Sequence, residues 1–209
     1  MKYEEYAKEV LFLRPWNEFG LPRSGKVLEI GSGDGWGMSA LRSLGLDPVG
    51  LDICTKAPGL VCGTATHLPF HSRVFDGVVC VRTLHHIRDD REVLTEAARV
   101  VRSGGFLFLA VANRLSYTLL SLRLRLRIAI PNKQDPFYRL YSRGTLRSLL
   151  WRIGFEIQNF RPCHFFPRLL SKVVDPKFVD KLAAWDASLG VNTMIGRFGP
   201  LLLVHGVKV

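Results

Sequence analysis

Apolar residues form two kinds of pattern along the chain. Short continuous apolar runs, typical of strands buried on both faces of a sheet, occupy residues 27–30, 49–51, 60–62, 75–81, 106–111 and 201–209. Between them, apolar residues repeat at intervals of three and four, as on one face of a helix, over residues 3–19, 36–44, 90–101 and 142–154. Strands that alternate with helices predict an α/β fold.

The most informative stretch joins the first apolar run to a series of glycines. Glu29 is followed by Gly31, Gly33 and Gly35, and a helical pattern starts directly afterwards. Strand, glycine turn and helix open a nucleotide-binding unit, because glycine lets the backbone approach a ligand and the helix start offers free N–H groups. A dinucleotide fingerprint would need a third glycine where Trp36 stands, and no Gly-Lys-Ser/Thr phosphate loop is present. The acidic residue favours a cofactor with an ammonium or sulfonium group and would repel a pyrophosphate.

A second acidic residue, Asp52, stands where the next apolar run ends. It lies about 20 residues beyond the glycine turn, the spacing at which a carboxylate reaches ribose hydroxyls in such folds. The structural alternative is an aspartate that stabilises a turn or caps a helix. Ile53 follows it and is expected to face an adenine ring.

Four segments resemble the motifs of class I S-adenosylmethionine-dependent methyltransferases of the methyltransferase type 11-like family. Residues 29–35 resemble the first motif, Glu-x-Gly-x-Gly-x-Gly. Residues 63–70 resemble Gly-Asp-Ala-x-x-Leu-Pro-Phe, with Thr64 where the family has an acidic residue near the adenine amino group; threonine can still accept a hydrogen bond. Residues 84–86 resemble the Leu-His-His after the fourth strand, and residues 96–105 resemble a helix ending in Leu-Lys-Pro-Gly-Gly.

The resemblance is close over residues 25–112 and implies a Rossmann-like α/β fold. It implies a seven-stranded, mostly parallel sheet with helices on both faces, an antiparallel last strand and a helical lid insertion. We therefore expect a single domain over residues 1–209. Its expected parts are a leading helix, a cofactor-binding half, a lid or insertion and a substrate-side half, at residues 1–24, 25–112, 113–141 and 142–209.

The resemblance also implies S-adenosylmethionine as methyl donor, with S-adenosylhomocysteine as product. It places the cofactor at Glu29, Gly31, Ser32, Gly33, Asp52, Ile53, Thr64, Ala65, Val81 and Arg82. Transfer from a sulfonium is an in-line displacement with a neutral leaving group, so alignment is the main requirement and only a poorly acidic acceptor needs a base. His86, with His85 as second candidate, is the expected base, and a packed structural role is the alternative. Neither C-x-x-C nor H-E-x-x-H occurs, so no metal is expected.

Residues 113–141 depart most from the family pattern. Leucine and arginine alternate strictly from Leu122 onward, which would suit a strand, yet both residue types favour helix and leucines also recur at helical spacing. We expect a helix or helical lid over the mouth of the site, with Arg123, Arg125 and Arg127 near that mouth.

The net charge of +11 lies entirely in the second part of the chain. Residues 1–113 hold 13 Lys+Arg against 13 Asp+Glu, whereas residues 114–209 hold 16 against 5. This asymmetry indicates an anionic partner, with an ordinary solvated surface as the alternative.

The remaining signals favour a cytoplasmic protein. The first nine residues carry three glutamates and no apolar stretch of a secretory signal, and no window of about 18 uncharged apolar residues predicts a membrane span. Three of the four cysteines lie in apolar runs and are expected to be buried thiols in a reducing compartment. The cysteines are Cys54, Cys62, Cys80 and Cys163.

The resemblance implies S-adenosylmethionine-dependent methyl transfer and favours a small-molecule or lipid-like acceptor. The alternatives are an RNA methyltransferase and a catalytically silent module that binds the cofactor. The leucines and arginines of the insertion would suit peripheral contact with an anionic membrane. RNA is the less favoured partner, because the insertion has no aromatic residue between Tyr117 and Phe137 on which bases could stack.

Overall fold

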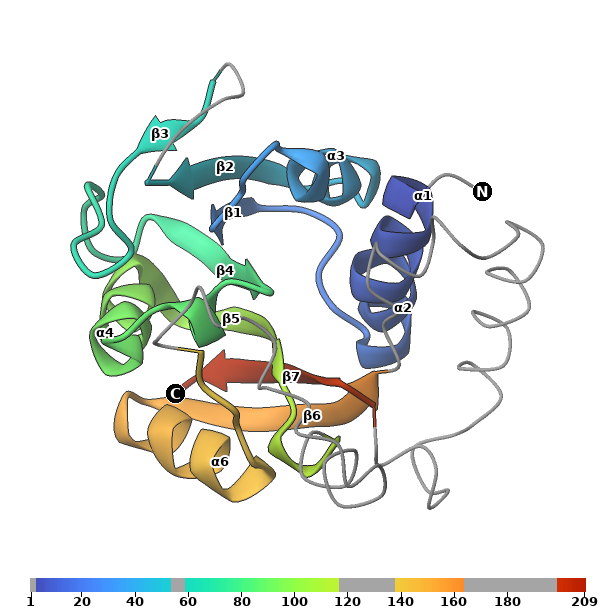
Figure 1. Ribbon diagram of the computed structural model, residues 1–209. Helices are drawn as coiled ribbons and strands as arrows, with labels where there is room; N and C mark the ends of the chain where they lie inside the picture. Colours follow the sequence, from blue (N-terminus) through green and yellow to red (C-terminus); the bar gives the residue numbers. More distant parts are fainter. Residues whose placement is uncertain (1–2, 54–58, 117–137, 164–198) are drawn as a thin grey trace.

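The computed structural model describes residues 3–53, 59–116, 138–163 and 199–209, and its centre is a seven-stranded sheet (Figure 1). The strands are β1 (Lys26–Ile30), β2 (Asp47–Asp52), β3 (Val61–Cys62), β4 (Phe75–Val81), β5 (Val101–Ala112), β6 (Phe155–Cys163) and β7 (Leu201–Lys208). They lie in the order β3-β2-β1-β4-β5-β7-β6. Strand β7 is antiparallel to both of its neighbours, and the other pairs are parallel. The predicted mostly parallel sheet with an antiparallel last strand is confirmed.

Helices cover both faces of this sheet, as predicted (Figure 1). They are α1 (Tyr3–Lys8), a π-helical turn (Glu9–Leu13), α2 (Arg14–Phe19), α3 (Trp36–Ser43), a 3-10 turn (Leu84–His86), α4 (Asp90–Val100) and α6 (Arg143–Arg152). Side chains of α1, α2 and α3 share one apolar cluster with the sheet, and those of α4 and α6 share the other. Among the helices that the structure describes, none is long and apolar enough to cross a bilayer.

The central strands are apolar on both sides because both sides are covered. Along β4, Val78 and Cys80 belong to the cluster with α4 and α6, while Val79 and Val81 belong to the cluster with α1 to α3. On the latter face the Trp16 ring contacts aromatic rings of β5, with centroids 5.4 and 5.7 Å apart. This double coverage is the physical reason for the continuous apolar runs in the sequence.

Several boundaries differ from the expected ones. The predicted single helix over residues 3–19 contains the π-helical turn. Helix α4 ends at Val100 and β5 starts at the next residue, so Gly104 and Gly105 lie in the strand and do not end the helix as expected. Strand β5 shifts register here against β4, and a Cβ at Gly105 would lie only 2.6 Å from the Asp76 carbonyl oxygen.

Cys80 and Cys163 are buried as expected, whereas Cys62 is exposed.

Most of the predicted insertion lies outside the described residues, including Arg123, Arg125 and Arg127. Its end is described: Tyr141 donates its backbone N–H to the Ala112 carbonyl at 2.9 Å, and Arg114 donates to the Tyr141 carbonyl at 2.8 Å. The chain therefore returns to the carboxyl end of β5 before α6 begins.

We expect His205 of β7 to make stability fall below neutral pH. Its ring lies against Phe19 and Phe106 at 6.5 Å each, and burial lowers its pKa below the ordinary 6.5. The unfolded chain therefore takes up a proton before the folded one does, so stability is full above about pH 6.5 and declines as the pH falls through this value. Thermal melting at pH 7.0, 6.0 and 5.0 should show a smaller loss for His205→Gln than for the parent protein. His71→Gln, at an exposed histidine, is the control; an unchanged pH dependence in His205→Gln would refute the assignment.

Candidate cofactor and acceptor site

The glycine turn after β1 needs glycine for two separate reasons. Gly31, Gly33 and Gly35 have φ values of 77°, 51° and 79°, which side-chain-bearing residues rarely adopt. At Gly31 a Cβ atom would also overlap the Thr83 side chain, which follows β4. At Gly33 nothing lies within 4 Å of the position of a Cβ atom, so the turn has open space on that side. The loop thus packs tightly against the sheet at one glycine and borders free volume at the next.

Asp52 lies against this turn at the carboxyl end of the neighbouring strand. The Gly33 N–H donates to Asp52 Oδ2 at 2.8 Å, and the N–H groups of Gly31 and Ser32 donate to the Leu51 carbonyl at 2.8 and 3.2 Å. Ile53, the next residue, is 77% exposed. The predicted carboxylate and the predicted apolar face therefore stand together beside the glycine turn.

Glu29 is buried below the turn, with only 4% of its surface exposed. A Cβ atom at Gly37 would overlap Glu29 Oε1, so this glycine makes room for the carboxylate at the start of α3. Burial, and next the charge of Asp52, raise the pKa of Glu29 from 4.5 to about 8, against the opposing effect of a hydrogen bond from the Met38 backbone. Glu29 Oε2 and Ser32 Oγ are buried and have no hydrogen-bond partner in the described part of the chain. Such atoms usually bind something, because a buried polar group without a partner costs free energy.

The segment after β3 completes this side of the site. The Gly63 N–H donates to the Asp52 carbonyl at 3.0 Å. Thr64 Oγ1 is already hydrogen-bonded to Thr66 Oγ1 at 2.9 Å, and Ala65 is buried. The Gly63 contact thus places the start of this segment, which continues into Thr64 and Ala65, beside the end of β2.

The histidine loop follows β4 on the other side of the glycine turn. Val81 ends the strand and is 7% exposed, and Arg82 adopts a left-handed φ of 60° while its N–H donates to the Ala110 carbonyl at 2.8 Å. His85 is 3% exposed, whereas His86 is exposed. Their ring centroids are 4.3 Å apart. Of the two candidate bases, only His86 faces solvent.

Tyr138 contacts both candidate bases, an arrangement that the sequence did not reveal. Its ring lies 5.0 Å from His85 and 5.2 Å from His86, both in edge-to-face arrangements. It comes from the end of the 113–141 segment, more than 50 positions along the chain, and no local pattern links it to the histidines.

Asp90 holds this segment in place, a role that was also missed. No side-chain hydrogen bond caps α4 at its Asp89 N-cap position. Asp90 is instead 2% exposed, accepts a hydrogen bond from the Tyr141 hydroxyl at 2.8 Å and forms an ion pair with Arg139. Arg139 also donates its backbone N–H to the His85 carbonyl at 2.8 Å. An aspartate in a first helical turn looks like a cap in sequence, so only the fold shows this contact.

All these groups therefore lie along the carboxyl ends of β1, β2, β3 and β4. One half offers two acidic side chains and an open glycine turn, which fit a cofactor with cationic and hydroxyl groups. The other half offers two imidazoles and a phenol ring. Within the described residues, no three His, Cys, Asp or Glu side chains gather as a metal site.

Curated relatives match part of the chain. A ubiquinone biosynthesis O-methyltransferase of Thiobacillus denitrificans is 28% identical over 115 residues, which cover 47% of this chain and 50% of the relative. A phthiotriol/phenolphthiotriol dimycocerosates methyltransferase of Mycobacterium leprae is 37% identical over 99 residues, 40% of this chain and 37% of the relative. The chain spans about half the length of these relatives or less.

Solved structures match the whole fold. A methyltransferase of Thermotoga maritima that depends on S-adenosylmethionine has a TM-score of 0.66 at 20% identity, covering 99% of this chain and 92% of its own. The 1,6-didemethyltoxoflavin-N1-methyltransferase of Burkholderia thailandensis, solved with its substrate and S-adenosylhomocysteine, has a TM-score of 0.62 at 18% identity, covering 100% of this chain and 79% of its own.

The sequence model of a methyltransferase domain family matches residues 2–159. This range is most of the chain and includes every predicted site residue. The chain therefore belongs to the family of class I S-adenosylmethionine-dependent methyltransferase domains.

Proposed function

We propose that this chain transfers a methyl group from S-adenosylmethionine to a small-molecule or lipid-like acceptor. The observation that carries the proposal is the junction of the glycine turn with Asp52 above the buried Glu29. Two curated relatives support the acceptor class, since one is named for ubiquinone biosynthesis and the other for phthiotriol dimycocerosates.

The residues of the cofactor half fit the proposed donor. Glu29 Oε2 and Ser32 Oγ offer buried, unsatisfied acceptors for an ammonium group, within the described part of the chain. Asp52 offers a carboxylate for ribose hydroxyls once its bond to the Gly33 N–H is shared or exchanged. Ile53, Thr64 and Ala65 would border the adenine ring of the cofactor. When bound, S-adenosylmethionine supplies a methyl group made electrophilic by its positively charged sulfur.

The residues of the acceptor half fit a role in alignment and proton removal. The acceptor atom would attack the methyl carbon with its lone pair as the carbon–sulfur bond breaks and its electrons pass to sulfur. His86 would take the proton that the acceptor loses, since it is the solvent-facing member of the histidine pair. His85 and Tyr138 would hold its ring, because all three rings are in mutual contact. Asp90 would act through Arg139 and Tyr141 as a positioning residue.

Gly33→Val should abolish binding of S-adenosylhomocysteine. A branched side chain would fill the open space beside the turn and be strained at a φ of 51°, so affinity should fall by about a hundredfold or more, about 3 kcal/mol. Calorimetric titration measures this. Gly104→Val is the matched control, because Gly104 has a left-handed φ of 72° and equally open surroundings in β5, away from the site. Equal affinity of the two variants for S-adenosylhomocysteine would contradict the assignment of the glycine turn to the cofactor site.

Binding of S-adenosylhomocysteine should release a proton from Glu29. The pKa of the free protein's Glu29 is about 8, so near pH 7 the carboxyl must ionise before it can pair with an ammonium group. Affinity should therefore rise from pH 6 to pH 8, by up to about tenfold per unit. Titrations in two buffers of different ionisation enthalpy count the proton. Glu29→Gln should bind more weakly and lose this pH dependence; an identical profile in the variant would contradict the role.

His86→Ala should lower turnover by about a hundredfold or more while leaving S-adenosylhomocysteine binding intact. The assay is transfer of tritiated methyl from labelled cofactor into the lipid, small-molecule, RNA and protein fractions of a cell lysate. Label in the lipid or small-molecule fraction supports the proposed acceptor class, and label in RNA or protein contradicts it. His71→Ala, at an exposed histidine outside the site, is the control. Full activity of His86→Ala and of His85→Ala would leave alignment as the whole mechanism.

A further inference from the structure

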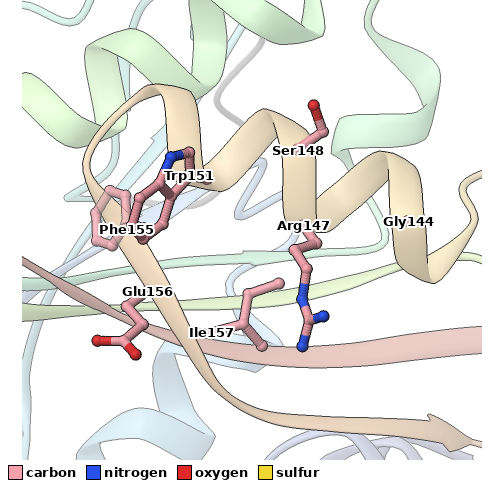
Figure 2. A pocket seen from close by; sticks show the side chains of 7 residues that line it. All are labelled: Gly144, Arg147, Ser148, Trp151, Phe155, Glu156 and Ile157. Atoms are coloured by element: carbon pink, nitrogen blue, oxygen red, sulfur yellow. The ribbon is translucent and has the colours of Figure 1, made fainter.

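A groove runs between α6 and β6, one of the two edge strands of the sheet (Figure 2). One hollow of about 500 Å³ is lined by Ser148 and Trp151 of α6 and by Ile157 of β6, among others. A second of about 480 Å³ continues along the strand to Phe160. Because Arg147 and Ile157 line both, the two hollows form one groove, which we call the α6 groove.

The helical wall of the α6 groove is a ridge of three exposed side chains. Arg143, Arg147 and Trp151 follow one another at intervals of four and therefore stand on the same side of α6. Trp151 is 70% exposed. Figure 2 shows Arg147 reaching down from the helix beside Ile157, with the Trp151 indole at the other end of the groove.

The ridge carries positive charge that the described structure does not neutralise. The α6 sequence holds arginines and no acidic residue. The Arg143 guanidinium lies 4.5 Å from the Phe160 ring and donates to the Phe160 carbonyl at 3.4 Å, which fixes its position. Within the described residues, neither Arg143 nor Arg147 forms an ion pair with a carboxylate. Glu156 of β6 also lines the first hollow, but the two arginines outweigh this single carboxylate. The groove therefore keeps a net positive charge and fits an anionic occupant.

We propose that the α6 groove docks on the surface of an anionic phospholipid membrane. Guanidinium groups pair with lipid phosphates, and an exposed indole has an apolar body with a polar N–H, the combination that concentrates at the headgroup boundary. The aliphatic side chain of Ile157 at the floor of the groove can contact the apolar part of the lipid headgroup boundary. The sequence placed membrane contact on the arginines of the insertion; the described structure supplies a second, independent surface for it.

Two other anionic partners fit the groove less well. An extended acidic peptide would pair with β6 as an added strand, but β6 shifts register between Ile157 and Asn159 and carries Pro162, features that interrupt edge pairing. Single-stranded RNA needs several open aromatic faces for stacking. Phe155 is only 1% exposed and Arg143 covers the Phe160 ring, which leaves Trp151 as the open aromatic face in the groove.

Docking here would also orient the acceptor half of the site. Helix α6 is capped by the Ser142 hydroxyl, which accepts from the Thr145 N–H at 3.1 Å, and Tyr141 immediately before it is bonded to Asp90. Arg143 thus begins the ridge close to the segment that carries Tyr138 against the histidines. When α6 docks on a membrane, the segment that carries Tyr138 comes close to a lipid-like acceptor in that membrane. This consequence rests on the proposed function, whereas docking itself does not require turnover.

Sedimentation with vesicles tests the proposal without any acceptor. The full chain should bind vesicles of phosphatidylglycerol and phosphatidylcholine at about 0.1 M salt, where charge interactions reach about 10 Å, and should not bind pure phosphatidylcholine. Arg147→Glu should weaken binding by about tenfold or more. Arg42→Glu is the matched control, since Arg42 is an exposed helical arginine of α3 on the other face of the sheet, and it should change binding less than about twofold. Trp151→Ala should weaken binding and remove the blue shift of tryptophan emission on vesicles.

Three results would overturn the proposal. They are no binding of the parent protein to anionic vesicles, equal losses in Arg147→Glu and Arg42→Glu, and tighter binding to polyglutamate or tRNA than to vesicles at the same salt. Thermal melting and S-adenosylhomocysteine titration of each variant test whether its fold and its cofactor half are intact. A failure of docking with intact cofactor binding would therefore leave the proposed function standing.

Discussion

The whole site depends on how closely the ends of β1 and β4 approach each other. The Gly31 backbone fills the space beside the Thr83 side chain so completely that no Cβ atom fits between them. With this contact made, the turn can present its next N–H groups to the Leu51 carbonyl and to Asp52 at the end of β2. Three strands are thereby fixed relative to one another. Since the histidine loop starts beside Thr83, any displacement of β4 would move the glycine turn and the histidines together.

The electrostatics of the cofactor half follow from the same crowding. Glu29 faces the interior because it lies two residues after the buried Val27, on the same face of a strand that is covered on both sides. Its burial makes the charged form costly, so the carboxyl retains its proton in the free protein at neutral pH. The raised pKa means that this group favours the folded state at low pH, and that this contribution is lost as the pH rises toward 8. A cationic group bound at Glu29 would favour the ionised carboxylate instead of the protonated carboxyl. Occupancy of the site would therefore affect the pH dependence of the stability of the whole sheet.

Most of the fold could be predicted from the sequence, because its signals are local. Strands covered on both faces must be apolar throughout, so β1, β4 and β7 stand out, and a glycine turn between strand and helix is short enough to recognise. The start of β5 could not be predicted, since Val101 continues the apolar spacing of α4 and only its pairing with Phe75 makes it a strand. Asp90 and Tyr138 were missed for a related reason: their partners lie about 50 residues away, and no pattern within one element encodes them. The cofactor-binding and catalytic roles of the predicted site residues stay predictions.

The place of β7 has a consequence for the order in which the sheet can be completed. Residues 201–208 lie between β5 and β6, and β6 pairs with no other strand in the described structure. Until β7 is in place, β5 therefore has an open edge of apolar residues, and β6 has no strand to pair with. Because a chain emerges from the ribosome with its amino end first, the cofactor half can assemble while this edge is still unpaired. Unpaired edges of this kind invite pairing with other chains, so the last strand protects a newly made molecule from aggregation as well as completing the fold.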